Sequence, residues 1–201
     1  MAQRNSCPTP SNDFAAVNSH APGSAAVAAA DALAWREEID GFCAHYGYDG
    51  QYMHDLLARS ARSFSAFRSA MELTKRRSSL PVEAHFTATI TVMQHEDCGS
   101  CLQLNLDMAL EAGVSSTTVR QIIESSADLP AVLCDVRTHT LGALGAIPQE
   151  FGAFKRIEAA YGAEAVGELA IAIAGARMYP TIKRALHRAT SCTSPRFEPM
   201  P

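Results

Sequence analysis

Two cysteines stand three residues apart in the run His95-Glu96-Asp97-Cys98-Gly99-Ser100-Cys101, and an apolar helical pattern begins directly after them. On a helix that starts at Cys98, this spacing places Cys101 on the same face one turn later, within reach of a disulfide. The first turn of a helix also presents unpaired N–H groups and the positive end of the helix dipole, which stabilise a thiolate over a thiol. Because the thiolate is the nucleophile, the spacing predicts a reversible dithiol.

Titratable side chains crowd the approach to this pair and are the candidates for a catalytic base. They are Glu83, His85, His95, Glu96 and Asp97. Glu96 and Asp97 can also oppose thiolate formation, because a carboxylate beside a thiol raises the pKa of the thiol unless the carboxylate points outward. Asn105 lies one further turn along and can orient a group, but an amide cannot shuttle a proton. The sequence leaves the identity of the base open.

The stretch from Glu83 to Gly113, and most clearly the part that begins at Cys98, resembles the AhpD-like, carboxymuconolactone decarboxylase family of small all-α proteins. The redox branch of that family has an upstream Glu, a Cys-x-x-Cys and a His four residues after the second cysteine. The resemblance implies that Cys101 is the attacking thiolate, that Cys98 is the resolving partner and that an upstream acid belongs to a proton relay. It also implies a homo-oligomer (a trimer, a hexamer or a related assembly) that reduces small peroxides or disulfides with electrons from a protein dithiol.

The chain departs from this family pattern at two positions. Asn105 stands at the position of the family His, and Phe86 stands twelve residues before Cys98, where the relay Glu is usual. Glu83, about one turn before Phe86, is therefore the candidate substitute for the relay acid. His85 and His95 are the candidates for the missing imidazole.

Three functions from different classes follow from these residues. The first is an antioxidant thiol–disulfide oxidoreductase or peroxidase that uses Cys98 and Cys101. The second, implied by the decarboxylase branch of the family, is a lyase or isomerase that acts on a small carboxylated lactone through acid–base groups such as His85 or His95. The third is a non-catalytic oligomeric binding protein.

A metal centre is the remaining interpretation of the motif. His95, Cys98 and Cys101 have the spacing of zinc ligands, but a structural zinc site needs four ligands and no second pair stands nearby in the sequence. We therefore expect neither a metal nor another cofactor.

Composition limits the partners and the compartment. Apolar residues make up 47% of the 201 residues and charged residues 19%, which is typical of one globular domain, and the net charge of -4 disfavours nucleic acid and anionic bilayers. The most apolar stretch, 163–179, contains charged residues and glycines that disfavour a membrane span. The first thirty residues are too polar for a secretory signal, and six cysteines are too sparse for a secreted disulfide scaffold. We expect a cytoplasmic protein without membrane attachment.

The apolar residues recur with a helical period, so the fold class predicted is all-α, an AhpD-like multi-helical bundle over residues 31–190. A disordered arm is expected over 1–30 and a flexible tail over 191–201. Helices are expected at about 31–46, 51–77, 82–94, 98–112, 118–127, 128–144, 148–161 and 164–188. Asp31 is the expected cap of the first helix, and the stretch 51–77 is one helix or two joined near 60–63. Ser115 or Ser116 caps the helix at 118–127, Gly162 ends the one at 148–161, and Pro180 bends the last one. Lys183, Arg184 and Arg188 are interpreted as the solvated cationic end of the last helix.

Overall fold

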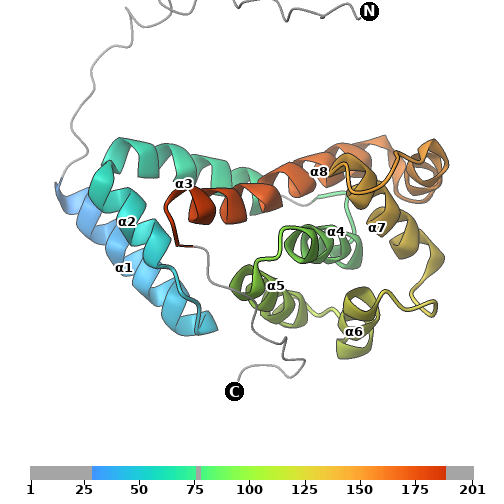
Figure 1. Cartoon of the computed structure of the whole chain (residues 1–201), viewed down its shortest axis with the longest axis horizontal. Helices are drawn as coiled ribbons and strands as arrows, with labels where there is room; N and C mark the ends of the chain where they lie inside the picture. Colours follow the sequence, from blue (N-terminus) through green and yellow to red (C-terminus); the bar gives the residue numbers. More distant parts are fainter. Residues whose placement is uncertain (1–28, 76–77, 189–201) are drawn as a thin grey trace, which may run out of the picture.

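The structure, a computed structural model, describes residues 29–75 and 78–188, and that part of the chain contains helices and no strand (Figure 1). The all-α class predicted from the apolar period is confirmed. The helices are α1 (Ala29–Tyr46), α2 (Gln51–Arg59), α3 (Ala61–Lys75), α4 (Val82–His95), α5 (Gly99–Glu111), α6 (Ser116–Glu124), α7 (Ala131–Ala143) and α8 (Phe151–Ala185). Residues 1–28 of the predicted arm, the predicted tail, Cys7 and Cys192 lie outside the described residues.

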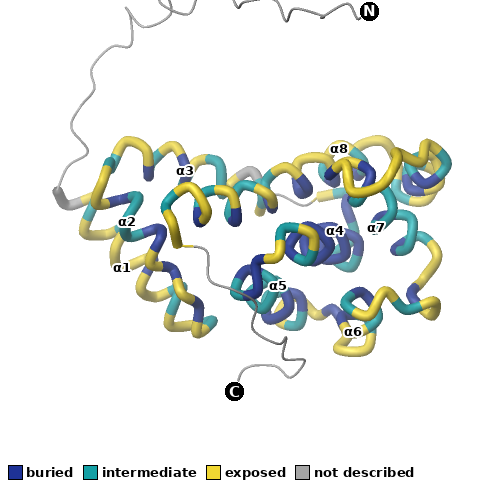
Figure 2. The backbone as a smooth tube through the Cα atoms, in the orientation of Figure 1, coloured by how far each residue is buried: buried dark blue, intermediate teal, exposed yellow. Residues whose placement is uncertain are grey.

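Helix α4 lies at the centre of one hydrophobic cluster, where it packs against α5, α6, α7 and α8 (Figure 2). Every residue from Ala84 to Met93 is buried. This segment carries no Asp, Glu, Lys or Arg, so it can be surrounded on all sides without leaving a charge of that kind in the core. The helix that leads into the dithiol motif is therefore held on several sides at once.

A second hydrophobic cluster joins α1, α2 and α3 around buried aromatic residues such as Tyr52, Phe64 and Phe67. Helix α8 connects the two clusters, because Leu169 packs in the first and Tyr179 in the second. The α3–α4 connection is also fastened to α8. There the Glu168 carboxylate accepts the backbone N–H groups of Ser78, Ser79 and Leu80 at 2.9, 3.1 and 2.7 Å.

Several helix ends follow the local signals of the sequence. Ser60 separates α2 from α3, and Ser115 caps α6 by accepting the backbone N–H of Thr118 at 3.0 Å. Gly113 follows the end of α5 with φ 91°, a conformation that favours glycine. Gly162, with φ 88° and ψ 166°, interrupts the helical backbone of α8, as predicted, although the two helical stretches abut.

Other helix starts differ from the predictions by two or three residues. Helix α1 begins at Ala29, so Asp31 lies in its first turn and is not its cap. Helix α7 begins at Ala131, after Pro130, and α8 begins at Phe151, after Pro148. In all three cases a residue with a strong terminal preference lies near the helix end without marking it, because helix ends fray and local preferences fix a boundary only to within a residue or two.

Helix α8 is the one described helix whose length and apolar composition would suffice for a membrane span. A core helix of a soluble protein passes the same test, which makes this weak support for a span. Helix α8 packs against α3, α4 and α7, and 28% of its most apolar stretch is buried.

Candidate functional site

Cys98 and Cys101 lie at the N-terminus of α5 and are joined by a disulfide, with their Cα atoms 5.3 Å apart. Cys98 is the residue before the first helical turn, and Cys101 lies one turn later on the same face, as the spacing of three predicted. Both are buried, with 7% and 2% of their surface exposed. A reagent therefore needs an opening between side chains to reach the Cys101 sulfur.

A cavity of about 380 Å³ has Cys101 on its wall. His85 and Thr89 of α4 and Asn105 of α5 are polar groups on the same wall. The wall also carries two ion pairs, Arg68 with Glu38 and Lys75 with Glu72, and the rest of it is mostly aromatic and aliphatic. The aromatic residues that line it are Trp35, Phe42, Tyr48, Tyr52, Phe64, Phe86 and Tyr179. Because the charges on the wall are paired with one another and most of the wall is apolar, the cavity fits a small, largely apolar molecule.

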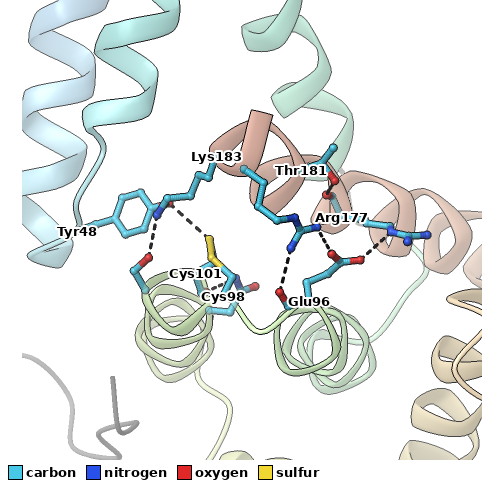
Figure 3. Close-up of a disulfide and its surroundings, with 10 residues drawn as sticks. Tyr48, Glu96, Cys98, Cys101, Arg177, Thr181 and Lys183 are labelled. Carbon is cyan, nitrogen blue, oxygen red and sulfur yellow. Dashed lines mark hydrogen bonds and ion pairs between the residues drawn. A yellow bond between two sulfur atoms is a disulfide. The ribbon is translucent and has the colours of Figure 1, made fainter. Parts of the chain in front are cut away.

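Lys183 of α8 points inward next to the disulfide and is only 1% exposed (Figure 3). Its ammonium group donates to Ser100 Oγ at 2.8 Å and to the Tyr48 hydroxyl at 3.5 Å. The Tyr48 hydroxyl in turn lies 3.8 Å from Cys101 Sγ. The interpretation of Lys183 as part of a solvated helix end is wrong, because the packing of α8 over the start of α5 turns this side chain into the interior.

Groups around Lys183 offset part of the cost of burying its positive charge. Burial lowers the pKa of its ammonium group, and the negative charges of Asp49 and of an ionised Cys43 act in the opposite direction. The Nζ atom also lies 4.9 Å and 5.4 Å from the ring centroids of Tyr48 and Tyr52, within the range of cation–π attraction.

Glu96 fixes the turn between α4 and α5 to α8. Its carboxylate pairs with Arg177 at 2.7 Å and with Arg184, and the Arg184 guanidinium also donates to the Glu96 backbone carbonyl at 3.0 Å. Burial acts to raise the pKa of Glu96, but the two guanidinium groups outweigh it and hold this pKa below its ordinary value. A carboxylate held in this way is a positioning group and is poorly suited to accept a proton.

The other predicted site residues fall into two groups. His85 and Asn105 lie on the wall of the cavity together with Cys101, and the Asn105 amide donates to the Cys101 carbonyl at 2.9 Å. His95 is exposed in the last turn of α4 and is not on that wall. Glu83 lies in the first turn of α4, about 18 Å along the helix from His95 at 1.5 Å per residue, so the structure does not bring it to the dithiol.

Two residues of the site, Tyr48 and Lys183, were missed by the sequence-based reasoning. Tyr48 lies in the connection between α1 and α2, far from the motif in sequence, and nothing local marks it. Lys183 had a signal, because it continues the buried spacing of Leu169, Ala172, Ala176 and Pro180 along the apolar face of α8. A lysine on the apolar face of a helix is the pattern that could have singled it out.

No protein-family model, curated protein or solved structure matches this chain. The resemblance to the AhpD-like family therefore depends on residues 83–113. Among the residues that the structure describes, no three His, Cys, Asp or Glu side chains come close enough to hold a metal ion. What the fold and the site define is an all-α protein with a Cys-x-x-Cys pair at a helix N-terminus, on the wall of an apolar cavity.

Proposed function

We propose that the protein is a thiol–disulfide oxidoreductase of the AhpD-like kind, which reduces a small peroxide or disulfide with the dithiol of Cys98 and Cys101. The observation that carries this proposal is the position of Cys101, bonded to Cys98 at a helix N-terminus and also part of the wall of a cavity large enough for a small organic molecule. The N–H groups of the first turn of α5 favour the thiolate in the reduced state.

The reaction begins at Cys101, the cysteine that lines the cavity. Its thiolate attacks an oxygen of the peroxide, the S–O bond forms as the O–O bond breaks, and the leaving alkoxide takes up a proton to become the alcohol. The Cys98 thiol then attacks the resulting sulfenic acid, the S–S bond forms and water leaves. With a disulfide substrate, the intermediate is a mixed disulfide and a thiol leaves.

A protein dithiol closes the cycle by returning two electrons and two protons to the disulfide. This donor, a homo-oligomeric assembly and a cytoplasmic location all belong to the proposal, because the family resemblance implies the first two and a reducing compartment keeps such a pair in turnover. Light scattering of the full-length protein tests the oligomer directly.

The decisive experiment replaces Cys101 with Ser and measures reduction of an alkyl hydroperoxide with a dithiol donor. We expect activity to fall to the uncatalysed rate, whereas Cys134→Ser should retain it, because Cys134 is a free, half-buried cysteine of α7 outside the cavity. Full activity of the Cys101→Ser protein would refute the proposal.

A lyase acting on a carboxylated lactone is the second candidate, and the position of His85 on the cavity wall is the observation that favours it. In that case activity on the lactone should survive the loss of both cysteines and disappear in His85→Gln. The mostly apolar lining favours the oxidoreductase, because the two cations on the wall, Arg68 and Lys75, are already paired with Glu38 and Glu72, and a substrate carboxylate would lose its hydration without a free cationic partner there.

A further inference from the structure

A buried cation and a buried hydroxyl stand beside the disulfide and have no role in the reaction described so far. The Nζ atom of Lys183 lies 3.5 Å from the Tyr48 hydroxyl, and this hydroxyl lies 3.8 Å from Cys101 Sγ (Figure 3). Two successive contacts thus connect an amine with the sulfur atom on the cavity wall. The three residues come from α8, the α1–α2 connection and α5, so only the folded chain brings them together.

We propose that Lys183 is the base that removes the Cys101 thiol proton in the reduced protein and that Tyr48 conducts this proton. The inference rests on the proposed oxidoreductase function. In the reduced protein the relay starts from the neutral Lys183 amine, which accepts the Tyr48 hydroxyl proton, so this hydrogen bond runs opposite to the one that the ammonium form donates. The S–H bond of Cys101 breaks as its proton passes to the Tyr48 oxygen, while the hydroxyl proton of Tyr48 passes to the Lys183 amine. The products are a Cys101 thiolate, an intact Tyr48 hydroxyl and a Lys183 ammonium group, so no external reactant is needed.

The groups that face Lys183 suit this exchange. Cys43 of α1 and Asp49 of the α1–α2 connection face Lys183 from one side, together with Tyr52 of α2. Ser100 and the dithiol face it from α5. Tyr179 and Arg184 lie on its own helix. Burial makes the neutral amine accessible at a lower pH than for a solvated lysine, and it also raises the pKa of Tyr48, which keeps this hydroxyl protonated. The Asp49 charge favours the ammonium group that forms.

The relay supplies the base that the sequence did not identify. Asn105, at the position of the family His, donates its amide to the Cys101 backbone carbonyl and carries no titratable proton. Glu96 is paired with two arginines, and Glu83 lies at the opposite end of α4. Lys183 has a chemistry that none of these three offers at Cys101, a proton acceptor connected to the sulfur through one hydroxyl.

The test measures the alkylation rate of Cys101 in the reduced full-length protein from about pH 5 to about pH 10, with iodoacetamide as probe and mass spectrometry of the Cys101 peptide as readout. We expect the wild-type midpoint well below the ordinary value of about 8.5. Lys183→Met removes the proton acceptor and the ammonium charge that it forms, and Tyr48→Phe removes the hydroxyl that lies beside the thiolate. Each variant should therefore move the midpoint upward by at least about one pH unit, which is about a tenfold loss of rate near pH 7. The matched controls Lys155→Met, an exposed lysine of the same helix, and Tyr161→Phe should leave the midpoint unchanged.

Two results would overturn the relay. One is a wild-type midpoint at or above about 8.5, which decides the matter even where a variant fails to fold. The other is an unchanged profile in either Lys183→Met or Tyr48→Phe, with circular dichroism showing native helix content. The proposed function fails in a different way: if a peroxide never converts the Cys98 and Cys101 thiols into a disulfide, the oxidoreductase is refuted, whatever the alkylation profile.

Discussion

Glu96 shows at the residue scale how one side chain fixes the position of the Cys98–Cys101 pair. It stands at the end of α4, two residues before Cys98, and its carboxylate holds Arg177 and Arg184 of α8. The carboxylate is buried, with 6% of the side chain exposed, whereas both arginines are about half exposed. The pairing therefore anchors the turn that carries the dithiol to the long helix that supplies Lys183.

Glu96→Gln should destabilise the protein by about 1–3 kcal/mol, because it removes charge-assisted hydrogen bonds from a buried site. The effect depends on pH. The pKa of Glu96 is lowered in the folded state, so its contribution is fully present above the unfolded value near 4.5 and is lost as the pH falls through the folded value. Urea unfolding at neutral pH and at successively lower pH measures both effects.

The control for this variant is Glu37→Gln, at an exposed glutamate of α1. The difference in stability between wild type and Glu96→Gln should shrink below about pH 4 and stay constant above about pH 6. A difference that is the same at every pH would contradict the assignment of the effect to the ionised carboxylate.

At the scale of elements, the contact between α3 and α8 decides where the second half of α8 lies. Gly175 of α8 faces Thr74 of α3 so closely that a Cβ at Gly175 would overlap the Thr74 methyl group. Thr74 has little freedom to move away, because its hydroxyl donates to the Met71 carbonyl at 2.8 Å and lies 3.2 Å from the Tyr179 hydroxyl. The absence of a side chain at Gly175 thus permits the approach that carries Tyr179 and Lys183 to the cavity region.

Gly175→Ala should destabilise the protein by about 1–3 kcal/mol through overpacking at this crossing. Gly167→Ala is the matched variant on the same helix, where nothing lies within 4 Å of an added Cβ. It should be neutral or stabilise the protein by up to about 1 kcal/mol, because alanine is the better helix former. Thermal unfolding monitored by circular dichroism compares the two, and equal effects would show that α3 and α8 are not in close contact at Gly175.

The cavity is a property of the whole molecule. Its wall takes Trp35 from α1, Tyr52 from α2, Phe64 from α3, Cys101 from α5 and Ala176 from α8. No single hydrophobic cluster contains all of these, so the cavity exists only where the α1–α3 cluster meets α4, α5 and α8. Its shape should therefore set which oxidants reach the sulfur.

Ala176→Leu should fill part of the cavity and slow the oxidation of the dithiol by a bulky organic hydroperoxide at least about tenfold, a cost of about 1.4 kcal/mol in the barrier. Oxidation by hydrogen peroxide, which is much smaller, should change little. Ala174→Leu, at an exposed position of the same helix, is the control. Stopped-flow measurement of the oxidation rate with each peroxide distinguishes entry of the oxidant into the cavity from the reaction at the sulfur. An equal loss of rate with both peroxides would mean that the substitution disturbs the dithiol itself.

The positions of most helices could be predicted from the sequence because their signals are local. Gly113 and Gly162 act within a turn or two of the chain, and the structure ends α5 next to the first and interrupts the helical backbone of α8 at the second. The sequence left two alternatives open at 60–63 and at Ser115 or Ser116, and the structure has the break at Ser60 and the cap at Ser115. The starts of α1, α7 and α8 differ from the predictions by two or three residues, since helix ends fray and a single residue with a terminal preference does not fix a boundary.

The sequence by itself determined the all-α class and the disulfide spacing of Cys98 and Cys101, because a three-residue separation at a helix start is a local property of the backbone. Only the tertiary structure decided which titratable groups meet the sulfur. Glu83 lies at the far end of α4, and His95 lies on the surface. Lys183, which follows Cys101 by 82 positions in the sequence, lies beside the dithiol in the fold. The reason is that helix packing brings residues distant in sequence to one site, and this information is spread over whole apolar faces and is not contained in any motif.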